Sequence, residues 1–146
     1  MDKKQETFAA GDVLRVNRGL YSHFGIYVGN GKVIHFSGGS KSELNPKKAR
    51  IIKTGLDFFV RGDPCSVSND ISCLRHSPEE IIQYAERMVG TDFGGYSLVR
   101  NNCEHFARWC ENGVRKSDQV DCIKRKVLVP VALMTVIFLR RKADAA

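Results

Sequence analysis

The fold is decided by one stretch of the chain, SHFGIYVGNGKVIHF at residues 22–36. Side chains in its first half alternate in character, and one face is apolar: Phe24, Ile26 and Val28. This period of two is typical of a half-buried strand. A glycine–asparagine–glycine turn follows, and a second apolar run begins after it. The stretch therefore predicts an antiparallel hairpin with strands at 22–28 and 32–36.

The length of the hairpin loop decides whether its two histidines, His23 and His35, share a face. A two-residue loop would turn His35 to the opposite face from His23. A three-residue loop sets His35 opposite Gly25 and makes His23 its diagonal neighbour, about 7–8 Å away. The three-residue form ends in a left-handed residue, a position for which Gly31 is suited. We expect two imidazoles on one face; two unrelated polar residues are the alternative.

The other elements predict an α+β domain with an antiparallel sheet packed against helices. Strands are expected at 11–17, 49–53 and 56–60, with loops at 37–46 and 61–70. A helix begins after Ser77, an N-cap followed by proline and, three residues on, by Glu80. It ends at Gly90, and a second helix runs from near Asn102 to Gly113.

Cys103 lies in the first turn of that second helix, within NNCEHFARWC at residues 101–110. Helical rotation places it on the apolar face with Phe106 and Cys110 and turns His105 about 200° away. Unpaired amides and the helix dipole at this end would lower the pKa of a thiol below about 8.5. An activated nucleophile and an inert buried cysteine are the two interpretations.

A nucleophilic thiol needs a base, and the chain has four histidines. His76 precedes a helix cap in a polar segment and is expected to be solvated, and His105 faces away from Cys103. His23 and His35 are therefore the candidates. No spacing typical of a zinc site is present, so we expect neither a metal nor another cofactor.

The net charge of +7 is concentrated near the C-terminus, where residues 114–146 carry +5 and residues 1–113 carry +2. Basic clusters at 124–126 and 140–142 flank thirteen largely apolar residues, 127–139. Such a run is about 20 Å long as a helix, shorter than a bilayer core of about 30 Å. Snorkelling basic side chains lengthen it, and anionic lipid attracts them. Membrane association or a single span is expected, with a buried core helix as the alternative.

The segment 1–12 has no apolar region typical of a secretory signal. The five cysteines, at positions 65, 73, 103, 110 and 122, are an odd number and favour reduced thiols. We therefore expect a cytoplasmic location. The basic excess is explained by the tail, so no nucleic-acid partner is expected.

GDVLRV, YSHFGIYVGNGKVIHF, NNCEHF and GVRKSDQV occur in this order. Together they resemble the lecithin:retinol acyltransferase superfamily, and most closely its phospholipase A and acyltransferase branch, also called H-Ras-like suppressors. The resemblance implies a catalytic domain at 8–120 and a membrane-associating tail at 121–146, which contacts lipid through 124–142. It also implies a circularly permuted papain-like fold of the NlpC type, with the catalytic cysteine at a helix N-terminus.

The same resemblance implies a Cys-His-His triad in which Cys103 is the nucleophile, His23 the general base and His35 the orienting residue. Tyr21 and Arg18 are candidate oxyanion or substrate contacts. The implied reaction is that of a phospholipase A1/A2 and acyltransferase. It moves a fatty acyl group from a glycerophospholipid, through a thioester, to water, an amine or a lysophospholipid. The alternatives are a cysteine peptidase or isopeptidase of the same fold and a retinol-type O-acyltransferase.

Overall fold

The computed structural model describes residues 7–39, 43–68, 75–97 and 102–113. Its centre is a five-stranded sheet in which the strand order is β4-β3-β2-β1-β5 and every described pairing is antiparallel. The strands are β1 (Val13–Asn17), β2 (Ser22–Gly29), β3 (Lys32–Ser37), β4 (Arg50–Gly55) and β5 (Cys65–Val67). The α+β class and the antiparallel sheet expected from the sequence are confirmed.

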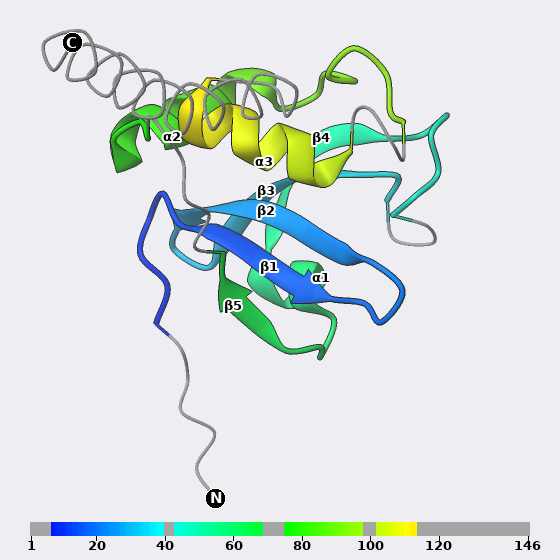
Figure 1. The fold of residues 1–146 in the computed structure, drawn as a ribbon, viewed down its shortest axis with the longest axis horizontal. Coiled ribbons are helices and arrows are strands. Elements are labelled where there is room, and N and C mark those ends of the chain that lie inside the picture. Colours follow the sequence, from blue (N-terminus) through cyan, green and yellow to red (C-terminus); the bar gives the residue numbers. More distant parts are fainter. Residues whose placement is uncertain (1–6, 40–42, 69–74, 98–101, 114–146) are drawn as a thin grey trace, which may run out of the picture.

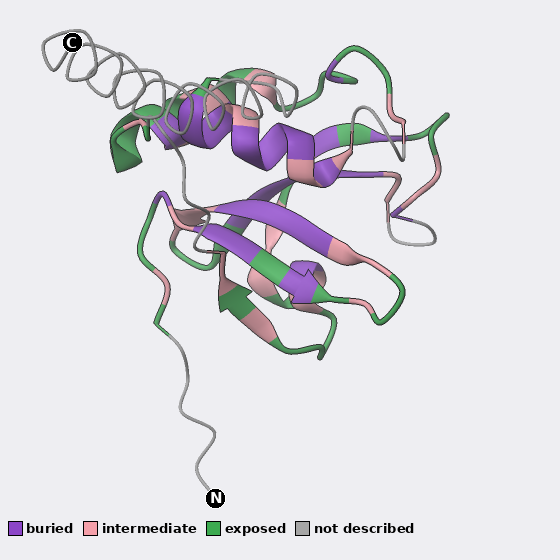
Figure 2. Ribbon diagram, in the orientation of Figure 1, coloured by how far each residue is buried: buried purple, intermediate pink, exposed green. Residues whose placement is uncertain are grey.

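Helices cover both faces of the sheet (Figure 1). The helices are α1 (Leu56–Val60), α2 (Pro78–Met88) and α3 (Cys103–Asn112). On one face α2 and α3 cover a core cluster that includes Ile26 and Phe106, and α3 is buried along its length (Figure 2). On the other face Phe59 of α1 packs with Leu14, Val16 and Val33 in a second cluster. The sheet therefore separates two apolar layers.

The β2–β3 hairpin has the register predicted for a three-residue loop. Gly25 pairs with His35 and Tyr27 with Val33, and the register shifts by one residue before the turn. Gly31 has a φ of 67°, the left-handed conformation that this loop requires. His23 and His35 consequently share the face that packs against α1.

Gly25 leaves the space that this face needs. A Cβ at this position would lie 2.6 Å from Val33 Cγ1 and 2.9 Å from Phe59 Cε2, both closer than van der Waals contact. It would also lie 3.2 Å from the Cβ of His35. The missing side chain therefore lets Phe59 pack closely against the sheet beside the two imidazoles.

Both long helices begin where the sequence predicts. Ser77 accepts a hydrogen bond from the backbone N–H of Glu80, whose carboxylate accepts from the N–H of Ser77. Asn102 caps α3, and Gly113 ends it in a left-handed conformation. The capping pattern places Cys103 at the first position of α3.

Two expectations in the middle of the chain are wrong. Residues 56–60 form the short helix α1 rather than a strand, because Gly55 serves as its N-cap and Arg61 ends it with a φ of 51°. This turn buries Phe59 alone among its five residues. The expected loop at 61–70 contains β5, three residues that pair with β1 directly after Pro64. Three residues are too few to show a strand periodicity.

Across the described ranges, no helix has the length and apolar character needed to cross a membrane. The expected membrane-associating tail at 121–146 lies outside the described residues.

We predict that Gly25→Ala destabilises the fold by about 1–3 kcal/mol, because the added methyl group overpacks the layer between Val33 and Phe59. Urea unfolding followed by circular dichroism would measure the change. Gly55→Ala is the matched control, since a Cβ there meets no atom within 4 Å and its φ of −66° suits alanine. Equal stability of the two variants would contradict this interpretation of Gly25.

Candidate active site

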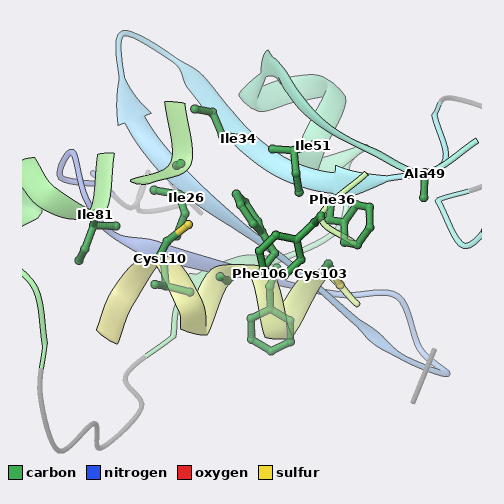
Figure 3. Packing of buried hydrophobic residues seen from close by; sticks show 14 residues of the cluster. Ile26, Ile34, Phe36, Ala49, Ile51, Ile81, Cys103, Phe106 and Cys110 are labelled. Atoms are coloured by element: carbon green, nitrogen blue, oxygen red, sulfur yellow. The ribbon is translucent and has the colours of Figure 1, made fainter. Parts of the chain in front are cut away.

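Cys103 lies in the first turn of α3 and points into the core between the helix and the sheet (Figure 3). It is 4% exposed, and its thiol donates to the backbone oxygen of Ser22 over 3.8 Å. The backbone N–H groups of Phe24 and Glu104 also point to the sulfur. The sulfur is thus in contact with β2 on either side of His23.

This contact is possible because the β2–β3 ladder has opened at its end. The pairing of β2 with β3 stops at Gly25 and His35, whereas β2 stays paired with β1 as far as Ser22. Tyr27 bonds to β1 through its backbone, and hydrogen bonding alternates along an antiparallel strand. The backbone oxygen of Ser22 and the backbone N–H of Phe24 therefore point to the β3 side of β2. There they contact the sulfur of Cys103, because β3 no longer pairs with β2 at these residues.

His23 and His35 lie together on the α1 face, buried at 1% and 0% exposure. His23 Nε2 is 2.9 Å from His35 Nδ1, and both rings pack against Phe59 at centroid distances of 5.2 Å. His35 Nε2 is 2.9 Å from the hydroxyl of Thr54 on β4. The predicted pairing of the two imidazoles is therefore present.

The hydroxyl of Thr54 fixes the protons of both rings. It donates to the carbonyl of Gly55, so it accepts from His35 Nε2–H. A neutral His35 then accepts at Nδ1 from His23 Nε2–H, and the lone pair of His23 lies on Nδ1. Within the described residues this Nδ1 is buried and has no hydrogen-bond partner. His23 is thereby held as a base with its accepting atom free.

Burial keeps the nucleophile and base candidates neutral. It lowers the pKa of His23 to about 4, against the raising effect of Glu43, and that of His35 to about 3. It raises the pKa of Cys103 to about 11, although the N–H groups of Phe24 and Glu104 act in the opposite direction. The expectation of a lowered thiol pKa is therefore wrong for the resting site, because desolvation outweighs the helix end.

Tyr21 and Arg18 form hydrogen bonds to a third group, Glu43. The Tyr21 hydroxyl donates to Glu43 Oε2 over 2.7 Å, and Arg18 binds both carboxylate oxygens, at 2.7 and 3.3 Å. Arg18 also donates to Asp63 and to the carbonyls of Phe59 and Val60. The hydroxyl hydrogen of Tyr21 and the guanidinium hydrogens of Arg18 therefore point to Glu43 and to the acceptors around it.

Sequence reasoning missed both Glu43 and Thr54. Glu43 lies in a segment without periodicity, and a serine- and lysine-containing stretch before it resembles an ordinary polar loop. Thr54 has the alternation of a strand residue, and only the β3–β4 register, which places Val33 opposite it, shows its proximity to His35. Each of these two residues joins the site through contacts with residues distant in the sequence, which a local sequence pattern does not show.

A pocket of about 530 Å³ opens beside the sulfur. Residues that line it include Tyr21, Ser22, Phe24, Tyr96, Asn102 and Cys103. Arg15 and Arg108 also line it, and the guanidinium group of Arg108 donates to Glu111 and Ser68. The described residues contain no cluster of histidine, cysteine and acidic side chains suited to a metal ion. The arrangement can place a bound carbonyl next to the Cys103 thiol.

His76, His105 and Cys110 lie in or contact the helices α2 and α3 and are outside the pair of His23 and His35. His76 is not fully solvated as expected: it is half-buried, stacks on Tyr84 and lies 3.1 Å from the backbone oxygen of Cys110 through Nδ1. His105 is directed back to Asn102 at the start of α3. Cys110 is fully buried in the core, as expected, and burial raises its pKa.

The neutral histidine pair predicts that stability falls in mild acid. Because the folded-state pKa of His23 is about 4 and that of an unfolded histidine about 6.5, the unfolded chain binds more protons between these values. The free energy of unfolding should therefore drop by about 2 kcal/mol from pH 7 to pH 5 through His23, and His35, whose folded-state pKa is about 3, should add a similar drop. Urea titrations across this range would measure it, and His23→Gln should make the fall shallower. A wild-type stability that does not change between pH 7 and 5 would contradict the neutral pair.

Comparisons with known proteins show the family of this chain. The family model described as "Lecithin retinol acyltransferase" matches residues 6–116. The chain is 36% identical to human phospholipase A and acyltransferase 2, with 75% of this chain and 74% of that protein covered. It is 37% identical to mouse phospholipase A and acyltransferase 3 (84% and 83% covered) and 30% identical to bovine lecithin retinol acyltransferase (84% and 64%). The chain belongs to the lecithin retinol acyltransferase family.

Proposed function

We propose that this protein is a thiol-dependent phospholipase A and acyltransferase that moves a fatty acyl group from a glycerophospholipid to an acceptor. Cys103 is the nucleophile, His23 the general base and His35 the residue that orients His23. The histidine strands precede the cysteine helix in the chain, which fits a circularly permuted papain-like arrangement. The names of the relatives support an acyl-transfer activity of this kind.

One observation carries the proposal: a buried histidine presents an unpaired Nδ1 on the strand that the Cys103 sulfur contacts. Burial without a hydrogen-bond partner is costly for a ring nitrogen, so an otherwise unsatisfied Nδ1 requires a functional reason. Acceptance of a proton from the neighbouring thiol supplies one. Cys103 and His23 form no hydrogen bond to each other in the described structure, and catalytic contacts often tighten only when substrate binds.

Acylation begins with transfer of the thiol proton from Cys103 to His23 Nδ1. The sulfur attacks the ester carbonyl, and the new carbon–sulfur bond forms a tetrahedral intermediate. The intermediate collapses when the ester carbon–oxygen bond breaks and His23 returns the proton to the departing alcohol oxygen. The products are an acyl thioester on Cys103 and a lysophospholipid.

Deacylation repeats these proton transfers with the acceptor. His23 takes a proton from water, an amine or a hydroxyl group while the acceptor attacks the thioester carbonyl. The carbon–sulfur bond breaks, and the proton returns to the sulfur of Cys103. In both halves the negative oxygen faces the backbone N–H of Cys103, because the first N–H groups of a helix have no partner within it.

The pocket beside Cys103 supports a phospholipid as the acyl donor. Arg15, an exposed residue, lines the pocket, and a guanidinium group binds phosphate oxygens well. Phe24 and Tyr96 supply apolar surface in the same pocket for an acyl chain.

Incubation with acyl-labelled phosphatidylcholine should produce a thioester adduct on Cys103, detected by mass spectrometry of its peptide. Cys103→Ala should form no adduct, and His23→Ala should reduce hydrolysis at least about a hundredfold because the thiol loses its base. His35→Ala should fall between His23→Ala and the wild type, since a water molecule can partly replace an orienting ring.

Two matched variants control for damage to the fold. Cys110→Ala removes a buried thiol from the same helix, and His76→Gln removes a histidine that contacts the C-terminal half of α3 at Cys110. Both should keep activity within about threefold of the wild type. Comparable losses in all folded variants, or cleavage of peptides without any lipid adduct, would overturn the assignment in favour of another carbonyl substrate.

We propose that the basic and apolar segment at 124–142, expected from the sequence, attaches the protein to lipid surfaces. Removal of residues 124–146 should abolish co-sedimentation with anionic liposomes while detergent-dispersed substrate is still cleaved, because the site residues all precede Gly113. Release of the full chain by high salt would indicate surface attachment, and resistance to salt and alkali would indicate insertion. A truncated chain that unfolds would show that the segment is part of the core.

A further inference from the structure

Glu43 is a buried carboxylate for which the acyl-transfer steps give no role. It is 4% exposed, and it lies in the loop between β3 and β4, between strands that the active site uses. Its Oε2 atom is 3.8 Å from His23 Nδ1, the free accepting nitrogen. A carboxylate is costly to bury unless it is paired, so its position requires an explanation.

We propose that Glu43 is a positioning residue for this reaction, whose negative charge holds the imidazolium that forms when His23 Nδ1 takes the thiol proton. This inference rests on the proposed function, since it names the group that stabilises one of its charged states. The distance of 3.8 Å is within reach of charge attraction but too long for a hydrogen bond to the carboxylate. Nδ1 therefore keeps its lone pair for the proton of Cys103.

The neighbours of Glu43 keep it ionised and fixed. Arg18 binds both of its oxygens, Tyr21 donates to Oε2, and Arg61 Nε lies 3.6 Å from Oε1. Burial alone would raise the pKa of Glu43, but Arg18, His23 and Tyr21 together bring it to about 2. The carboxylate is therefore charged at every pH at which the protein would act.

Other charged or titratable groups also act on His23, and their signs define the test. On β3, His35 lies at the Nε2 side of the His23 ring, and on α3, Cys103 contacts the backbone oxygen of Ser22, the residue before His23. Burial lowers the pKa of His23, Glu43 raises it, and the guanidinium groups of Arg18 and Arg61 lower it. Removal of Glu43 and removal of Arg61 should thus change the stability of the imidazolium in opposite directions.

A purely structural role would not produce this pair of opposite effects. Loss of Glu43 leaves Arg18 without its main partner, and loss of Arg61 removes an outer contact of the same carboxylate. If Glu43 only fastened its loop to the β1–β2 turn, both losses would loosen the cluster and reduce activity. If its charge acts on His23, the two variants separate.

The test compares Glu43→Gln and Arg61→Gln in the full chain, each checked for folding by circular dichroism. Histidine-labelled protein gives the pKa of His23 by NMR, and labelled phosphatidylcholine gives the rate of adduct formation on Cys103. Glu43→Gln should lower the pKa of His23 and reduce kcat roughly ten- to a hundredfold with little change in KM, about one decade per pKa unit. Arg61→Gln should raise both the pKa and kcat.

Asp63→Asn is the matched control. Asp63 is a half-exposed carboxylate on the other side of Arg18, and its loss should change kcat by less than about threefold. Shifts of the same sign in the Glu43 and Arg61 variants, or no shift in either, would overturn the proposal. If Glu43→Gln fails to fold, the sign of the Arg61→Gln shift decides. A wild type that forms no adduct would refute the acyl transfer, whereas opposite NMR shifts would still support the coupling of Glu43 to His23.

Discussion

The hydrogen bond between His23 and His35 is the constraint on which the site depends, because it joins two buried rings that have few other polar partners. It requires the three-residue loop, which sets the register, and it requires Gly25, which leaves room for Phe59 beside the rings. Thr54 then fixes the direction of the protons from the next strand. An error of one residue in the register would place His35 in the other apolar layer, with no imidazole opposite it.

The second constraint is the opening of the sheet between β2 and β3. If the ladder continued to Ser22, the backbone groups that face the Cys103 sulfur would be paired with β3. Because it stops at Gly25, α3 can bring its first turn to the edge of β2 while the rest of the helix packs on the core. The sheet thus carries the proposed base, His23, on one layer, and its opened edge contacts the proposed nucleophile, Cys103, from the other.

Much of this arrangement can be predicted from the sequence where the signal is local. The hairpin register follows from Gly31, and the position of Cys103 follows from the cap at Asn102 and the end at Gly113. The helix at 56–60 could not be predicted, since a five-residue segment with one buried phenylalanine has no helical period. The membership of Glu43 in the site depends on long-range contacts with Arg18 and Tyr21, which no spacing rule encodes.

The protonation states of the site explain how burial and reactivity coexist. The Cys103 thiol, with a pKa near 11, and the His23 imidazole, with a pKa near 4, are both neutral at rest, so the resting site carries little of the thiolate that is readily oxidised. The same difference in pKa makes proton transfer from Cys103 to His23 unfavourable. The surroundings therefore have to stabilise the resulting thiolate and imidazolium when substrate binds. The N–H groups of Phe24 and Glu104 favour the negative sulfur. The fixed negative charge of Glu43, 3.8 Å from His23 Nδ1, favours the positive ring. Dipoles and charges held rigidly in advance need no reorganisation during the reaction. Reactivity at this site is therefore a property of the surroundings of Cys103 and His23 and not of either side chain alone.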